Sequence, residues 1–164
     1  MHSEPPVLDD ASIALIQSSH AAKVLAVADR HRRATATYAY TCRVDAASGR
    51  VLAAIERGQA APVLAALETG GRVTLVACDI ETFRSLQVKG DGARVVALGP
   101  AEREDVAAHC REFARFSAEV GYDPAVTLAH MGCRADDAVC IEFTLRQGFV
   151  QTPGPTAGQP LPPP

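Results

Sequence analysis

The sequence predicts a mainly β protein, in which a closed or half-closed antiparallel barrel carries helices at its periphery. The chain has 164 residues, the size of one domain. Apolar residues make up 48% of it, with no Trp and only five Phe, so Val, Leu, Ile and Ala must fill the core. Such a core suits strands with tightly packed faces. Several strand-like segments also follow one another across short turns, which favours a barrel.

The first half of the chain predicts a short helix followed by three strands. Asp9 and Asp10 precede an apolar face beginning at Ile13, as at a helix N-terminus. Alternating apolar residues then predict three strands, the second and third joined by the Gly-bearing turn Asp45–Gly49. These strands are expected over Lys23–Asp29, Ala34–Val44 and Arg50–Ile55.

The second half predicts three helices and further strands. Pro62 is compatible only with the first turn of a helix over Gln59–Thr69, which Gly70 should end. A long helix should begin at Pro100, and a short one should run from Pro124 to about Met131. The strands of this half are expected over Arg72–Asp79, Phe83–Leu98 and Val139–Val150.

Gly90-Asp91-Gly92 interrupts the segment Phe83–Leu98. Asp-Gly is a strong hairpin signal, but an insertion of this kind can also be a bulge in one long bent strand. The local sequence leaves both alternatives open.

Charge and composition argue against several classes of protein. The net charge of −3 argues against wrapping a nucleic acid. Residues 1–8 lack the basic start and apolar stretch of a signal peptide, and no apolar run is long enough to span a membrane. We therefore expect a cytoplasmic protein with no nucleic-acid or membrane partner.

The five cysteines give no recognisable metal or disulfide pattern. Their number is odd and no pair has C-x-x-C spacing. We expect free, largely buried thiols and no metal site; the cysteines are Cys42, Cys78, Cys110, Cys133 and Cys140.

Three segments could hold a ligand. Arg57 and Gln59 lie where a strand gives way to a helix, and the free amides of a helix N-terminus favour an anion, although a surface arginine there is commoner. In a strand, Ser85, Gln87 and Lys89 share one face and form a polar ladder that could bind a planar heterocycle or simply face solvent. The segment Gln151–Pro155 permits either an ordered turn or a loose extension.

These pieces together resemble the pyridoxamine 5′-phosphate oxidase-like, FMN-binding split-barrel family. The resemblance rests on Glu56–Gly90, where a helix ending in Gly and a β-run closing in Asp precede Arg84-Ser85-Leu86-Gln87-Val88-Lys89-Gly90. The tail QTPGPTAG resembles the ending of one uncharacterised branch, and the similarity covers Ala11 to Leu161.

The resemblance implies a split antiparallel barrel and a homodimer with FMN bound at the subunit interface. It implies that Arg57 and Gln59 lie near the flavin phosphate, and that Gly90-Asp91-Gly92 is a kink within one strand. It also implies that Arg84, Ser85, Gln87 and Lys89 line or support the same site. The two prolines around a glycine in Gln151–Pro155 restrict the backbone, so we expect the tail to pack at the barrel rim up to about Gly158, where Gln151 and Thr152 would offer hydrogen bonds near the flavin.

Departures from the family pattern narrow the expected activity. True oxidases have Arg-Gln where this chain has Arg84-Ser85, and a Ser-Arg-Lys phosphate cluster where it has Arg57-Gly58-Gln59. Related chains often place arginine where this one has Tyr38. These differences argue against pyridoxamine phosphate oxidation and leave an FMN-dependent oxidoreductase or flavin reductase of unknown substrate.

Other readings of the same barrel remain. The protein could be a flavin-binding or vestigial dimer without turnover, or could bind a deazaflavin or haem in place of FMN. Candidate haem ligands are His20, His31, His109 and His130, none of them in a ligand motif. No residue is predicted as a catalytic acid, base or nucleophile.

The expected organisation has three parts. Residues 1–8 form a flexible N-terminus, residues 9–158 the barrel domain, and residues 159–164 a Pro-rich tail that frays from Leu161 onward. Valine-rich strands such as Val73–Ala77 and Val139–Phe143 carry more apolar surface than one small barrel hides, which independently favours a homodimer.

Overall fold

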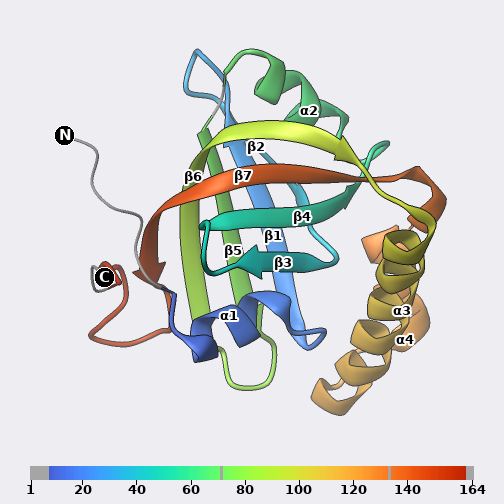
Figure 1. Ribbon diagram of the computed structural model, residues 1–164. Helices are drawn as coiled ribbons and strands as arrows, with labels where there is room; N and C mark the ends of the chain where they lie inside the picture. The colour runs from blue at the N-terminus through green and yellow to red at the C-terminus, as the bar shows by residue number, and fades with distance from the viewer. Residues whose placement is uncertain (1–7, 71, 133, 162–164) are drawn as a thin grey trace.

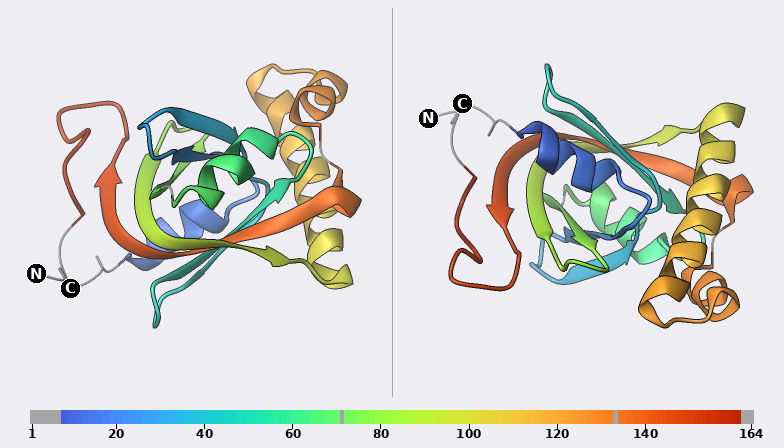
Figure 2. Two further views of the ribbon diagram at one scale, coloured as in Figure 1. Left: turned by 90° about the horizontal axis from the view of Figure 1, so that it is seen from above. Right: turned by 90° about the horizontal axis from the view of Figure 1, so that it is seen from below.

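The barrel is a single seven-stranded antiparallel sheet that curls round on itself (Figures 1 and 2). In this computed structural model, residues 8–70, 72–132 and 134–161 are described. The strand order is β2-β1-β5-β6-β7-β4-β3. The strands are β1 (Ala21–Ala28), β2 (Ala34–Tyr38), β3 (Cys42–Asp45), β4 (Arg50–Glu56), β5 (Arg72–Asp79), β6 (Ser85–Ala97) and β7 (Ala138–Val150).

Two short helices close the ends of the barrel. Helix α1 (Asp10–Gln17) lies across one end and α2 (Ala61–Glu68) across the other (Figure 1). Asp9 caps α1, since its carboxylate accepts a 2.7 Å hydrogen bond from the amide of Ser12. Pro62 lies in the first turn of α2, and Gly70, at φ 83°, follows its end. Both helices are where the sequence predicts them.

Aliphatic side chains fill the space that these elements enclose. Alternate residues of each strand point inward, so the central strands contribute buried Leu25, Val73 and Val88. Ile16 of α1 and Val63 of α2 complete the core from the two ends. The inward alternation means that the other residues of the same strands form an outer sheet face.

The segment around Gly90 is one kinked strand. This confirms the kink that the family resemblance implies and excludes the hairpin that Asp-Gly alone suggested. Strand β6 runs unbroken from Ser85 to Ala97 and pairs with β7 along its length. Its register shifts between Lys89 and Gly90 and again between Asp91 and Arg94. These two irregularities bend β6 near its middle, so that its first and second halves run in different directions.

The predicted strand Ala34–Val44 is wrong as one element. It divides into β2, which pairs with β1, and β3, which pairs with β4 at the other edge of the sheet. Between them, the amide of Tyr40 donates to the carbonyl of Ala54 at 2.8 Å. The alternation of apolar residues continues through the break, so the pattern alone could not reveal it.

Two further helices lie beside the barrel. Helix α3 (Pro100–Ser117) continues through a 3-10 turn (Ala118–Val120) to α4 (Pro124–Met131), and another 3-10 turn (Ala135–Asp137) leads into β7. A second buried cluster joins α3 and α4 to β4 and β7; it includes Tyr40, Ala54, Val106, Met131 and Cys140. None of the described helices is long and apolar enough to cross a membrane.

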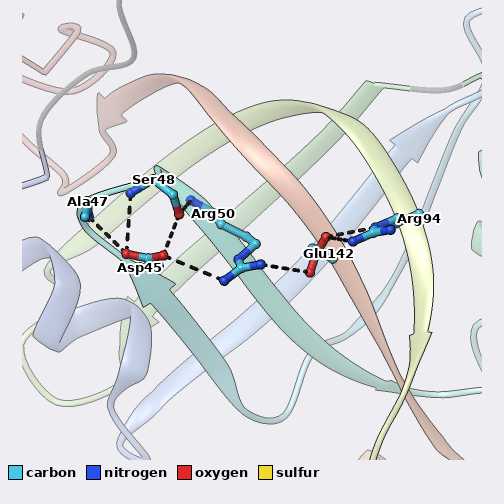
Figure 3. A network of polar contacts seen from close by, with 6 residues as sticks. All are labelled: Asp45, Ala47, Ser48, Arg50, Arg94 and Glu142. Atoms are coloured by element: carbon cyan, nitrogen blue, oxygen red, sulfur yellow. Dashed lines mark hydrogen bonds and ion pairs between the residues drawn. The ribbon is translucent and has the colours of Figure 1, made fainter.

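Ion pairs on the open side of the sheet connect its strands. Glu142 of β7 accepts from Arg94 of β6 at 2.6 Å and lies 3.9 Å from Arg50 of β4 (Figure 3). Arg50 also lies 3.8 Å from Asp45 (Figure 3). The carboxylate of Asp45 accepts a 2.6 Å hydrogen bond from the hydroxyl of Ser48 and so stabilises the β3–β4 turn. The arginines of this network are exposed, whereas Glu142 is partly buried, and ion pairs with exposed partners add little to the stability of the fold.

The cysteines only partly follow expectation. Cys42 and Cys140 are buried free thiols, and Cys78 is a half-buried one. Cys110 is disulfide-bonded, so the prediction of a free thiol there is wrong. Cys133 lies outside the described residues.

The chain termini differ from the predicted boundaries. Leu8 is buried in the core, so the predicted flexible segment does not include it, and residues 1–7 lie outside the described residues. The tail returns along β7, where the amide of Leu161 donates to the carbonyl of Gly148 at 2.8 Å. Leu161 packs against the core, so the prediction that it frays is wrong; residues 162–164 are not described.

Candidate functional site

Strands β2, β1, β5, β6 and β7 share one outer face, which carries mainly small and apolar side chains on β2 and β1 and polar ones on β6. The pairing of the five strands lines up one residue from each in a row across this face. The row consists of Tyr38, Val24, Val76, Gln87 and Phe149. Val24 is 37% exposed, which is high for a valine at the centre of a sheet. We call this surface the outer face.

A second row runs parallel to the first. It consists of Ala36, Ala26, Thr74, Lys89 and Gln147. The alanines leave the β1–β2 side of the outer face low and flat, whereas Gln87 and Lys89 rise from β6. Helices α1 and α2 lie at the barrel ends and α3 and α4 lie beside the barrel, where α4 reaches the outer face only at its Tyr38 edge (Figures 1 and 2). The outer face is therefore open to a flat ligand or another protein surface.

Gln87 and Lys89 are the predicted site residues that the fold places most clearly together. Both are half-buried on the same side of β6, two residues apart. The ammonium of Lys89 lies 4.8 Å from the ring centre of Phe149, a cation–π contact that holds the charge near the face. They offer an amide and a cation above apolar neighbours.

Ser85 and Thr152 join the tail to the start of β6. The amide of Ser85 donates to the hydroxyl of Thr152 at 2.9 Å, and the amide of Gln151 donates to the carbonyl of Ser85 at 2.9 Å. The Ser85 hydroxyl donates to the carbonyl of Phe83 at 2.8 Å. These residues order the chain next to Gln87, and their polar atoms are largely used in doing so.

Arg57 and Gln59 lie at the junction of β4 and α2, and both are exposed. Asp137 occupies part of this junction: its carbonyl accepts from the amide of Arg57 at 3.0 Å, and its carboxylate accepts from the amide of Gly58 at 3.1 Å. Glu56 beside them is buried, and its Oε2 has no hydrogen-bond partner within the described part of the chain. Attraction for an anion there must come from the Arg57 side chain.

Arg84 lies apart from this junction. It precedes β6, is exposed, and is close enough to Asp9 of the α1 cap to influence it. The pKa of Asp9 is lowered chiefly by its hydrogen bonds from Ser12, with a smaller contribution from the Arg84 charge. The fold thus places Arg84 toward the α1 end of the barrel.

Two hollows open on the outer face. One of about 330 Å³ is lined by Val24, Tyr38 and Gln59, among others, and so connects the β4–α2 junction to the first row. A larger groove of about 600 Å³ lies at the other end, over the second row. It is within the usual size of small-molecule sites and includes Lys89.

Sequence reasoning missed a polar pair beside the smaller hollow. The phenol of Tyr38 lies 2.7 Å from Nε2 of His130 on α4, with their rings edge to face. This contact joins α4 to the edge strand β2. The only sequence signal for this pair was that Tyr38 stands where related chains often have arginine. Nothing in the sequence linked Tyr38 to His130.

The four histidines proposed as haem ligands each have separate local contacts. His109 lies beside Lys23, His20 stacks on Phe116, and His31 accepts from Arg30 within the β1–β2 turn. In the described part of the chain, no three His, Cys, Asp or Glu side chains gather where they could hold a metal ion.

The outer face has features that suit a planar heterocycle. Val24, Ala26 and Val76 form a flat apolar surface, while Gln87 and Lys89 supply hydrogen-bond donors at one side of it. A flavin has an apolar ring system with a polar pyrimidine end, and these residues match both parts. Since the face is shallow, one chain alone covers only one side of such a ring.

Comparisons with known proteins identify the fold. The sequence matches no family model and no curated protein. Among solved structures, HupZ of Group A Streptococcus matches with a TM-score of 0.53 at 12% identity, over 92% of this chain and 100% of that one. A candidate pyridoxamine 5′-phosphate oxidase of Lactobacillus delbrueckii matches with a TM-score of 0.52 at 15% identity, over 87% and 93%.

A third structure, described as an F420 reductase, matches with a TM-score of 0.50 at 12% identity, over 82% of this chain and 93% of that one. The chain therefore has the split-barrel fold of pyridoxamine 5′-phosphate oxidase-like proteins, as the resemblance predicts. At such low identity, the likeness shows the fold alone.

Proposed function

We propose that this protein is a homodimer that binds FMN on the outer face and acts as a flavin-dependent oxidoreductase or flavin reductase. The observation that carries the proposal is the flat row of Val24 and Val76 beside Gln87, on a fold whose neighbours include a candidate oxidase and an F420 reductase. The second copy would cover the side of the ring that one chain leaves open.

The residues would divide the task as follows. Gln87 and Lys89 would bind the pyrimidine end, where the ammonium stabilises negative charge on the reduced ring by Coulomb attraction. Arg57 would meet the phosphate, with Gln59 beside it, while Ser85, Gln151 and Thr152 hold the rim and Arg84 adds positive charge from the α1 end. When bound, FMN supplies hydride and electron transfer, and the protein supplies position and exclusion of water.

A second candidate is flavin binding without turnover. This candidate is supported by the β4–α2 junction, where Asp137 accepts hydrogen bonds from two backbone amides that a phosphate could otherwise use. Glu56 places a buried carboxylate beside them. Both weaken the attraction for a phosphate and argue for a cofactor held loosely. An absorption spectrum of the purified protein distinguishes bound FMN from the two alternative ligands, a deazaflavin and haem.

The test is a fluorescence titration of FMN into the full-length protein and its variants. Arg57→Ala and Gln87→Leu each remove a polar contact, and loss of a charge-assisted one should weaken binding roughly ten-fold or more. Arg115→Ala, an exposed arginine on α3 paired with Glu119, is the control and should bind like the parent. Equal dissociation constants for all four proteins would refute the proposed site.

Turnover is tested separately. The FMN-loaded protein is mixed with NADH or NADPH without oxygen, and bleaching of the flavin absorption is followed. Reduction faster than that of free FMN supports the oxidoreductase. Tight binding without such acceleration by either donor supports the non-catalytic candidate.

A further inference from the structure

Positive charge gathers at one end of the outer face. Arg72, Lys89 and Arg146 line the groove of about 600 Å³, together with a single carboxylate, Asp91. The groove therefore has a net charge of +2 on a chain whose total is −3. Because concave surfaces of one sign concentrate their field, such a groove attracts anions.

The cations of the groove are only partly neutralised. Arg146 makes two 2.9 Å hydrogen bonds to the carboxylate of Asp91, and both side chains remain about half exposed. Lys89 contacts the ring of Phe149. Arg72 is exposed and has no ion-pair partner among the residues that the structure describes. Two of the three cations thus keep their charge available to a ligand.

The adjoining turn adds to this charge. Ala28, the last residue of β1, pairs with both Ala34 and Arg72, so the β1–β2 turn lies at the same end of the sheet as the groove. The turn carries Arg30, Arg32 and Arg33, of which Arg33 is paired with Asp29. Six of the 16 Lys and Arg residues therefore lie at this end.

The floor of the groove fits a small molecule. Ala26, Ala28 and Ala34 line it, and their short side chains leave space between the turn and β6. Thr74 and Gln147 add neutral hydrogen-bonding groups between the cations. A ligand here would meet an apolar floor with guanidinium groups at its rim, an arrangement that suits phosphate or carboxylate groups.

We propose that this groove binds a small molecule bearing phosphate or carboxylate groups, distinct from the flavin and next to it on the outer face. Lys89 lies in the same row as Ala26 and Thr74, one row from Gln87, so such a ligand would border the proposed flavin ring. That this molecule is the substrate or electron donor rests on the proposed function, whereas anion binding in the groove does not.

The test uses pyrophosphate and citrate as separate probes, titrated by calorimetry into the full-length protein at constant ionic strength. Arg72→Ala should raise the dissociation constant of the bound probe about ten-fold. Arg146→Ala should raise it as well, because it leaves the carboxylate of Asp91 unpaired beside the anion. Arg94→Ala is a matched control, because Arg94 also pairs with a carboxylate on the neighbouring strand, Glu142 (Figure 3). It should leave binding unchanged, and thermal melting checks that every variant is folded.

The two probes distinguish the chemistry of the ligand. Preference for pyrophosphate indicates a phosphorylated ligand, and preference for citrate indicates a polycarboxylate; both support an anion groove. If neither probe binds, or if binding is the same in the arginine variants and the control, the inference is wrong.

A third titration separates the groove from the flavin site. FMN is titrated with and without saturating pyrophosphate, and its dissociation constant should change by much less than ten-fold, because Lys89 is the one residue that we assign to both sites. A ten-fold loss of FMN affinity would show that the groove holds the flavin's own phosphate and would overturn the proposal of a separate ligand. Arginine-dependent pyrophosphate binding in a protein that binds no FMN would refute the proposed function and leave the anion groove standing.

Discussion

The ammonium of Lys23 lies 3.4 Å from Nε2 of His109, which joins strand β1 to helix α3 in the protein interior. Lys23 is 2% exposed and also donates to the carbonyls of Ser18, Ala21 and Tyr40 at 2.6 to 3.2 Å. Burial lowers the pKa of Lys23 to about 8. Burial and the neighbouring ammonium lower the pKa of His109 to about 3.

This pair predicts a loss of stability on mild acidification. Between pH 7 and pH 5 the unfolded chain protonates His109, whereas the folded chain keeps it neutral, so the free energy of unfolding falls with pH. With a His109 pKa of 6.5 in the unfolded chain and about 3 in the folded one, the free energy of unfolding falls by about 2 kcal/mol between pH 7 and pH 5. Urea unfolding at pH 5, 6 and 7 measures it.

The variant His109→Gln isolates this effect, because glutamine keeps an acceptor for Lys23 but does not titrate. Its stability should change less over the same range. Carboxylates with lowered pKa values, such as Asp29 and Asp45, also destabilise the fold in acid, but they do so equally in both proteins. If the stability of the parent and that of the variant fall equally with pH, His109 does not have a lowered pKa in the folded protein.

The kink in β6 predicts different costs for two neighbouring glycines. A Cβ added at Gly90 would lie 2.3 Å from the ring of Phe143 and 2.5 Å from the carbonyl oxygen of Thr144. Gly90→Ala should therefore destabilise the protein by about 3 kcal/mol through overpacking. At Gly92, where φ is 65° and no atom lies within 4 Å, alanine should cost only about 1 kcal/mol of backbone strain. Thermal unfolding of the two variants measures both losses of stability. Equal losses would contradict the close packing of Gly90 against β7.

The sequence predicted local structure better than it predicted pairing. The cap at Asp9 and the Pro-initiated helix at Pro124 depend on nearby residues, and both formed as expected. The division of Ala34–Val44 depends on which strands lie opposite each half, and the disulfide at Cys110 depends on which cysteine the fold brings beside it. Neither is encoded in the alternation or spacing of nearby residues.

The candidate site shows the same difference. Strand alternation placed Ser85, Gln87 and Lys89 on one face. The hydrogen bond between Ser85 and Thr152, the position of Asp137 beside Gly58 and the gathering of Arg72 with Arg146 all join segments far apart in the chain. Such contacts follow from the barrel's topology and could not be read from single motifs.

The tail predicts a graded response to truncation. The chain ended after Leu161 keeps every described contact of the tail and serves as the reference for melting temperature. Ending it after Gly158 removes the hydrogen bonds from Val150 to Gln159 and from Leu161 to Gly148, and uncovers part of the core, at a cost of about 2 kcal/mol. Ending it after Val150 also removes the contact of Thr152 with Ser85 and should cost more. Identical melting curves for the three truncated proteins would mean that the tail contributes nothing to stability.

The outer face predicts how the proposed homodimer would form. Ala26 lies at its centre, beside Ala36 on one side and Thr74 on the other. Ala26→Arg would direct a long charged side chain away from the core, so the monomer should fold normally. Between two copies, however, the same side chain would hold the faces apart and bury a charge without a partner, which is costly.

Light scattering should therefore find a dimer for the parent protein and a monomer for Ala26→Arg at micromolar concentration. Ala47→Arg makes the same change in the exposed β3–β4 turn and should remain dimeric. Since the proposed flavin lies between the two copies, Ala26→Arg should also lose FMN binding while keeping the parent's melting behaviour at low protein concentration. A parent protein that is already monomeric, or a dimer that survives Ala26→Arg, would show that the outer face is not the dimer interface.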